Sequence, residues 1–76
     1  MSVRIKCFAS LRQQLGIDSI EVEHRSDMTV GDGWRALSAA PPPPNLLCAR
    51  NFEYAEFDSS VADGDEIAFF PPVTGG

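Results

Sequence analysis

The last two residues of the sequence, Gly75 and Gly76, combine a residue type and a position that could support chemistry. Glycine has no Cβ, so this segment could thread a narrow channel that bulkier residues would block. We expect Gly76 to offer an unhindered carboxylate that ATP could activate as an acyl-adenylate. An extended chain starting at Val73 would reach about 13–14 Å beyond a folded body. The pattern is typical of an arm that delivers its last atom into another protein, although frayed termini often contain glycine as well.

The rest of the sequence offers no second set of catalytic residues. The single histidine, His24, has no serine or cysteine placed beside it by any recognisable pattern. Cys7 and Cys48 stand in apolar surroundings without Cys-X-X-Cys spacing, and we interpret them as small buried hydrophobic residues. A disulfide between them stays open, because it needs the two Cα atoms within ~7 Å. We predict no metal site and no catalytic machinery belonging to this chain alone.

One motif in the middle of the chain resembles a nucleotide-binding signature. Residues 31–36 match the G-x-G-x-x-A pattern of dinucleotide-binding proteins. That pattern requires a strand–helix–strand unit with a parallel return strand, in a much larger domain. Here the helix is expected to begin before the glycines, and four prolines at 41–44 stand where the return would start. We therefore interpret the match as a coincidence.

Composition and charge exclude several classes of protein. The chain has 76 residues, 43% of them apolar, which predicts one globular domain. A net charge of −5 argues against nucleic acid as a partner, and no apolar stretch is long enough to span a membrane. The start of the chain does not resemble a signal peptide, so we expect a cytoplasmic protein. Carboxylates collect in the last third, either as a solvated face or as a surface that steers a basic partner: Glu53, Glu56, Asp58, Asp63, Asp65 and Glu66.

The first half of the chain predicts two strands and two helices. Alternation predicts strands over residues 3–8 and 19–24, with a short helix or wide loop between them. Ser10 and Gln13 have the spacing of a capping box, and Gly16 is placed to end that helix. The main helix begins near Thr29, where Asp32 again completes a capping box, and it buries Trp34.

The second half predicts strands over residues 46–49, 53–57 and 66–70, with a tight turn at 63–65. This order of elements indicates an α+β fold of the β-grasp, or ubiquitin-like, type. In it a mixed sheet of four to five strands packs on one main helix. We expect the β-grasp domain to cover residues 1–72 and a flexible Gly-Gly tail to cover residues 73–76.

The final block of the sequence resembles a known family. Residues 63–76, DGDEIAFFPPVTGG, look like the terminus of the molybdopterin synthase small subunit, a sulfur carrier of the MoaD/ThiS type. Residues 3–12, VRIKCFASLR, resemble the first strand and loop of the same family. The resemblance implies that Gly76 is adenylated with ATP and then converted to a thiocarboxylate, with no cofactor bound. The thiocarboxylate would give its sulfur to a cyclic pyranopterin monophosphate during molybdenum cofactor biosynthesis.

The same resemblance implies three partners. They are a ubiquitin-activating-like adenylyltransferase, a sulfur donor (a sulfurtransferase or cysteine desulfurase) and the large synthase subunit, with which the chain would form a heterotetramer. Val73, Thr74 and Gly75 would thread the partner's active site with Gly76. Phe70 is our candidate hydrophobic anchor on the partner, and Pro71 and Pro72 would aim the arm.

Some features depart from the family pattern, and three other functions remain open. Arg50 replaces an apolar residue, and Gly31 and Gly33 weaken the main helix for no reason that the sequence reveals. The chain could carry sulfur for thiamine or cysteine synthesis, although such carriers generally lack the Phe-Phe-Pro-Pro segment. It could be a ubiquitin-like modifier attached to lysines, or a plain interaction domain.

Overall fold

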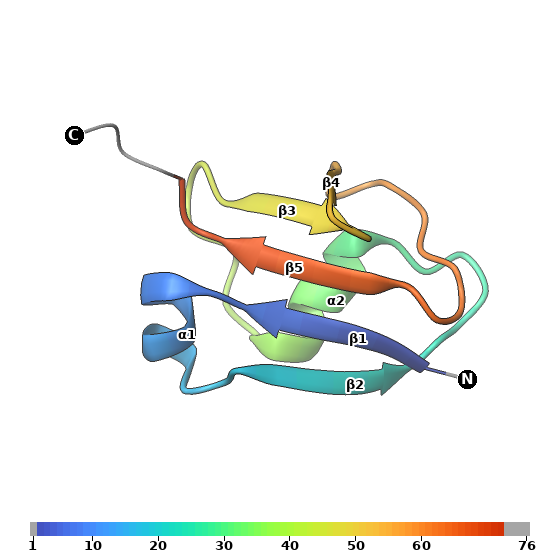
Figure 1. Ribbon diagram of the computed structural model, residues 1–76, viewed down its shortest axis with the longest axis horizontal. Coiled ribbons are helices and arrows are strands. Elements are labelled where there is room, and N and C mark those ends of the chain that lie inside the picture. Colours follow the sequence, from blue (N-terminus) through green and yellow to red (C-terminus); the bar gives the residue numbers. More distant parts are fainter. Residues whose placement is uncertain (1, 73–76) are drawn as a thin grey trace.

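A computed structural model describes residues 2–72 of the chain as one mixed sheet with a main helix across one face (Figure 1). Strand β1 (Ser2–Cys7) pairs antiparallel with β2 (Ser19–Glu23) and parallel with β5 (Glu66–Phe70). Strand β3 (Leu47–Arg50) lies antiparallel to both β5 and the short β4 (Glu53–Tyr54), which gives the order β2-β1-β5-β3-β4. Helix α1 (Ala9–Leu15) follows β1, and the main helix α2 (Val30–Leu37) follows β2. The predicted β-grasp fold is confirmed.

Helix α2 begins where the sequence places it. The Asp32 amide donates to the Thr29 hydroxyl at 3.3 Å, and the Asp32 carboxylate accepts from the Thr29 amide at 2.9 Å, which together form the predicted capping box. The hydrogen bond from the Thr29 amide favours the charged form of Asp32 and lowers the pKa of that carboxyl. Because Val30, Trp34 and Leu37 fall on one helical face, α2 buries an apolar stripe against the sheet.

The structure explains the two glycines in α2. A Cβ on Gly33 would lie 3.2 Å from the Cδ1 of Ile67 and 3.4 Å from the Cδ1 of Ile5, so the helix approaches the sheet closely at this point. The Gly31 amide donates to the Phe57 carbonyl at 2.8 Å, and a Cβ there would lie 3.2 Å from that same oxygen. The glycines therefore sit inside a helix that packs tightly, and they form no nucleotide-binding loop.

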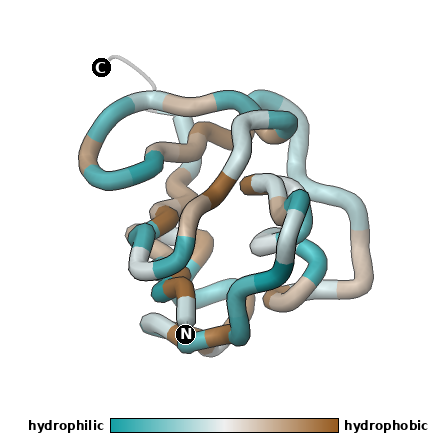
Figure 2. The backbone as a smooth tube through the Cα atoms, turned by 90° about the vertical axis from the view of Figure 1, so that its right-hand side faces the viewer, coloured by the Kyte–Doolittle hydropathy of each residue, from teal (hydrophilic) through white to brown (hydrophobic). Residues whose placement is uncertain are grey.

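The core is formed between α2 and the inner face of the sheet. Phe69 is fully buried and meets Trp34 edge-on, with ring centroids 5.5 Å apart. Cys7 and Cys48 are buried and free, as expected of small hydrophobic residues. Figure 2 shows the hydrophobic segments gathered in the interior of the trace and the hydrophilic ones at its edges. The inward side chains that build this core are Val3, Ile5, Cys7, Cys48, Ile67 and Phe69 from the sheet and Val30, Trp34 and Leu37 from the helix.

Two local predictions were wrong. Helix α1 has Phe8 at its N-cap and no side-chain cap, so Ser10 lies inside the helix and forms no capping box with Gln13. Its predicted end is confirmed, because Gly16 adopts a left-handed φ of 69°. Strand β4 ends at Tyr54 and not at residue 57, because the chain turns inward there and places Phe57 against Phe69. No helix within residues 2–72 is long and apolar enough to cross a membrane.

Candidate functional site

The candidate site begins where β5 ends. Val73, Thr74, Gly75 and Gly76, the predicted arm, lie outside the described residues. The arm must leave from the central strand of the sheet, which β1 and β3 hold on both sides. At its end the Phe8 amide donates to the Phe69 carbonyl at 3.2 Å. Pro71 is half-buried and Pro72 is exposed. The chain therefore emerges to the surface from a strand that its two neighbours hold in place.

The outer face of the sheet carries an apolar patch beside this departure point. Phe70 points to the face opposite the core and is partly exposed, with its ring centroid 6.0 Å from that of Tyr54. Tyr54 is 79% exposed. Strand register brings small and apolar residues beside this pair, and we call the whole group the outer patch: Leu47, Ala49, Tyr54, Ala68 and Phe70.

Phe70 was predicted from the sequence as a hydrophobic anchor on this face, whereas Tyr54 was not. The position of Tyr54 in a predicted strand could have indicated that its side chain lies on one face of the sheet. Its pairing with Ala49, however, depends on a two-residue hairpin turn. That turn places both Asn51 (φ 51°) and Phe52 (φ 70°) in the left-handed region. Asparagine is typical of such a turn and Asn51 indicates one, but phenylalanine is rare in this region, so the sequence does not predict the two-residue geometry.

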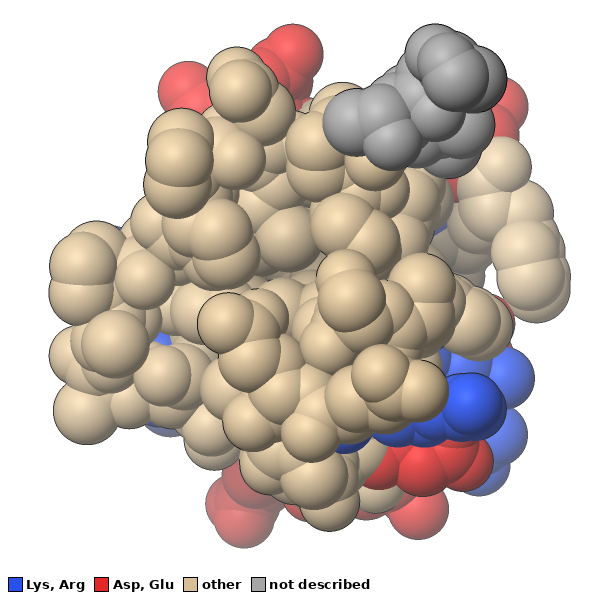
Figure 3. Space-filling model, turned by 90° about the vertical axis from the view of Figure 1, so that its left-hand side faces the viewer, with Lys and Arg blue, Asp and Glu red and all other residues tan. Residues whose placement is uncertain are grey.

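Charge is distributed unequally around the end of β5. Residues 36–49, which include the whole connection from α2 to β3, contain no charged side chain. Figure 3 views this end of the molecule and shows the charged atoms at its margins, with an uncharged expanse between them. On the outer face, Lys6 on β1 lies 3.8 Å from Glu66 in a partly exposed ion pair beside the outer patch. A partner that covers the uncharged end would therefore desolvate few ions.

The opposite end of β5 is held by a polar network. Asn51 donates to the Asp65 carboxylate at 2.9 Å and accepts from the Glu66 amide at 2.9 Å. The Asp65 carboxylate also accepts from the Ala62 amide at 2.8 Å, and Gly64 turns the chain with a φ of 87°. These bonds to its charged form, the one from Asn51 above all, lower the pKa of the Asp65 carboxyl. The network fixes the start of β5 and hence the direction in which its far end points.

Other reactive side chains do not form a second site. Burial raises the pKa of both cysteine thiols, with smaller contributions from Asp18 at Cys7 and Glu56 at Cys48, so neither is an activated nucleophile. His24 lies 2.8 Å from the Val61 carbonyl and makes no hydrogen bond with a cysteine or serine side chain among residues 2–72. Within this part of the chain, no three metal-ligating side chains come together.

Arg50 also has a structural role. Its guanidinium donates to the Ser60 carbonyl and so ties β3 to the connection between β4 and β5. A charged residue fits at this position because its end reaches the surface, where the carbonyl provides a partner.

Comparison with known proteins places this geometry in a family. The ThiS family model matches residues 5–76. The chain is 37% identical to the molybdopterin synthase sulfur carrier subunit of Escherichia coli K12, with 97% of this chain and 99% of the relative covered. It is also similar to small archaeal modifier protein 1 of Haloferax volcanii, with 36% identity and 93% and 97% coverage of the two chains.

Solved structures agree with the fold. The crystal structure of the Haloferax volcanii modifier superposes with a TM-score of 0.81 at 32% identity, and the match covers both chains completely. A chain in the complex of subunits 1 and 2 of the Helicobacter pylori molybdopterin-converting factor has the same fold, with a TM-score of 0.66, 20% identity and complete coverage of both chains. The match of the family model over residues 5–76 and the 37% identity to the Escherichia coli relative show that the chain belongs to the ThiS family.

Proposed function

We propose that this protein is a sulfur carrier that serves as the small subunit of molybdopterin synthase. The observation that carries the proposal is the block DGDEIAFFPPVTGG, which supplies the central strand β5, its anchoring turn and a Gly-Gly end. The similarity to the Escherichia coli sulfur carrier subunit along nearly the whole chain supports it.

The chemistry takes place at the carboxylate of Gly76. Attack of this carboxylate on the α-phosphate of ATP forms the acyl-adenylate and releases pyrophosphate. A persulfide carried by a sulfurtransferase or cysteine desulfurase then attacks the carbonyl carbon and displaces AMP. A second thiol cleaves the resulting acyl disulfide, which leaves the thiocarboxylate on Gly76 and a disulfide between that thiol and the donor cysteine. The resulting thiocarboxylate gives its sulfur to a cyclic pyranopterin monophosphate, and two such transfers build one dithiolene. Partner enzymes supply the catalytic groups, and this chain supplies the arm and its docking surface.

The outer patch and the uncharged end of the molecule form the surface for the large subunit. Phe70 and Tyr54 are the aromatic anchors, since exposed aromatic residues dominate the binding energy of interfaces. Pro71 follows directly and aims the arm into the partner's pocket. In this arrangement docking of the patch and insertion of the tail are one event, and two carriers flank a large-subunit dimer in a heterotetramer.

Intact-mass spectrometry tests the proposal. The protein is incubated with ATP, an activating enzyme and a sulfur donor, and a variant that lacks Gly76 serves as the control. We expect a mass gain that corresponds to replacement of one oxygen by sulfur, in the complete protein only. An unchanged mass with an activating enzyme that is competent on a related carrier would contradict the proposal.

A second candidate is a protein modifier that becomes attached to lysines through Gly76. The specific observation in its favour is the similarity to the Haloferax volcanii modifier in both sequence and structure. A modifier would leave isopeptide conjugates in cells that disappear when Gly76 is deleted. A carrier for thiamine or cysteine synthesis would form the thiocarboxylate but would not yield molybdopterin with the large subunit.

A further inference from the structure

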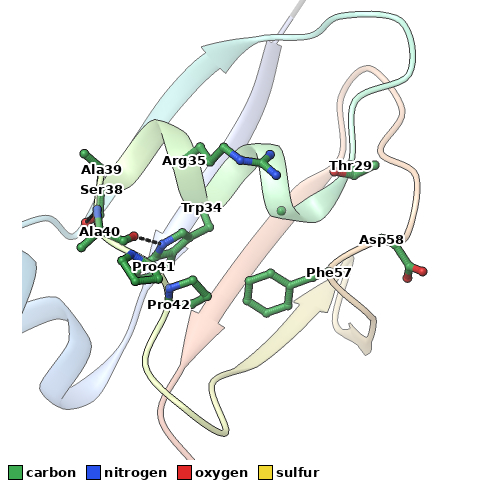
Figure 4. A pocket seen from close by; sticks show the side chains of 11 residues that line it. Thr29, Trp34, Arg35, Ser38, Ala39, Ala40, Pro41, Pro42, Phe57 and Asp58 are labelled. Carbon is green, nitrogen blue, oxygen red and sulfur yellow. Dashed lines mark hydrogen bonds between the residues drawn. The ribbon is translucent and has the colours of Figure 1, made fainter.

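A groove of about 670 Å³ lies on the helical side of the molecule and takes no part in the function proposed above. Trp34 and Pro42 line one side of it, and the ring of Phe57 stands on the other (Figure 4). Phe57 contacts Phe69, which points into the core, whereas Phe70 points to the outer face. The groove and the outer patch therefore lie on opposite sides of the sheet.

Both walls of the groove are fixed to α2 by hydrogen bonds. On one side the indole Nε1 of Trp34 donates to the Ala40 carbonyl at 2.8 Å, which holds the proline segment against the helix. On the other side the Gly31 amide donates to the Phe57 carbonyl at 2.8 Å. A groove whose walls are already in place can bind a side chain without first ordering its own residues, which lowers the entropic cost of binding.

The charges at the rim are unbalanced. Arg35 lines the groove, but its guanidinium is paired with the Asp32 carboxylate of the same helix. Asp58 also lines the groove; it is exposed and forms no salt bridge with another residue in the range 2–72. The free charge beside this apolar groove is therefore negative, and its complement is a cation.

We propose that this groove binds a partner protein through one aromatic or long aliphatic side chain flanked by lysine or arginine. The apolar anchor lies between Phe57 and Pro42 beside Trp34, and an adjacent cation reaches Asp58, the unpaired carboxylate among the lining residues. The binding mode is that of a hot-spot pocket, in which a buried anchor provides affinity and rim charges provide orientation. Because the outer patch faces the other way, both surfaces can be occupied at once. The inference holds whether or not the chain carries sulfur.

Nuclear magnetic resonance of the full-length protein tests the groove directly. The probe is acetyl-Lys-Phe-Lys-amide, added up to about 5 mM so that a millimolar complex is detected. Acetyl-Lys-Ala-Lys-amide and acetyl-Glu-Phe-Glu-amide are the controls for the anchor and for the charges. We expect the Trp34 indole and the Gly31 amide signals to move with the first peptide and to move little with either control.

Charge reversal separates the groove from general attraction to an acidic protein. Asp58→Lys should weaken binding of the peptide by at least about fivefold, because it replaces attraction at the rim with repulsion. Asp63→Lys makes the same charge change at the exposed turn before β5 and should leave the affinity unchanged. Neither variant alters a core residue, so both should fold.

Three outcomes would overturn the inference. The first is a spectrum that does not change at the highest peptide concentration. The second is an equal response to all three peptides, or equal weakening by both variants, which would indicate non-specific attraction. The third is movement of the groove signals on dilution without peptide, which would identify a second copy of this chain as the occupant. None of these outcomes depends on thiocarboxylate formation, so the test also distinguishes this inference from the proposed function.

Discussion

The two ends of strand β5 are built from different interactions. At its start, Asn51 and Asp65 hold the turn with side-chain hydrogen bonds, and Glu66 pairs with Lys6. At its finish, Phe70 and Pro71 are partly exposed and lie beside a stretch of sequence without charge. The first end satisfies its polar groups within the molecule, whereas the second leaves apolar surface uncovered.

This contrast indicates which end serves the fold and which serves a partner. Hydrogen bonds and the left-handed turn at the start of β5 fix the strand in register, so changes there should lower stability. Exposed apolar side chains at the end of β5 stabilise the fold less than buried ones would. Their burial by a partner contributes more free energy to binding. Four changes separate the two ends, beginning with the largest expected effect.

Extension of the chain by one residue after Gly76 should abolish sulfur loading. The extended protein no longer ends in the glycine carboxylate that ATP activates, while the folded body is unaltered. We expect no mass gain in the loading reaction and an unchanged midpoint of thermal unfolding. The same residue added before Met1 is the control and should load normally. Loading of the C-terminally extended protein at the normal rate would refute the role of the terminus.

Phe70→Ala should weaken binding to the large subunit by about 10- to 100-fold, the range for loss of an aromatic anchor. The matched control is Phe52→Ala, which removes an aromatic ring that is 91% exposed at the hairpin tip, near the opposite end of β5. Isothermal titration calorimetry measures both affinities. If the two variants bind equally well, the apolar finish of β5 is not the docking surface.

Several features that depend on local patterns were predicted correctly from the sequence, although the capping box of Ser10 and Gln13 was not among them. The capping box of Thr29 and Asp32, the end of α1 at Gly16 and the alternation in β5 all follow from spacing within a few residues. The predicted β-grasp order followed from the succession of these elements. Phe70 could be assigned to the outer face because residues alternate along a strand.

Most of the other features that the sequence did not predict depend on contacts between distant segments. Gly33 is explained by Ile5 and Ile67, which are far from it in the chain. The partnership of Asn51 with Asp65 spans 14 residues, and it becomes visible only when β3 lies beside β5. Strand β4 ends early because Phe57 turns toward the core, and strand propensity alone does not predict that turn.

Asn51→Ala should lower the free energy of unfolding by about 1–2 kcal/mol, because it removes two hydrogen bonds and leaves a non-glycine residue without a polar side chain at positive φ. The control is Asn45→Ala, since Asn45 has a similar φ of 64° but makes no side-chain hydrogen bond with residues 2–72. Urea denaturation gives both values, and their difference isolates the network. Equal losses would show that only the backbone conformation matters.

The smallest expected effect is a dependence of stability on pH at the polar end of β5. The pKa of Asp65 is lower in the folded protein than in the unfolded chain, where it is about 3.9. Its contribution is therefore fully present above that value and is lost as the pH falls through the lower, folded pKa. Wild-type protein should lose stability below about pH 4, with Asp32 contributing in the same direction.

Asp65→Asn removes this titration and should flatten the acid limb of a plot of unfolding free energy against pH. Asp63→Asn, in the same turn but outside the network of Asn51 and Ala62, should leave the limb as it is in wild type. Binding of the large subunit above pH 5 should be equal in both variants, because neither change touches Phe70. An acid limb unaffected by Asp65→Asn would mean that the charge on Asp65 does not stabilise the turn. The anchoring of β5 would then rest on the bond from the Glu66 amide to the Asn51 side chain and on the backbone pairing of Asn51 with Glu66.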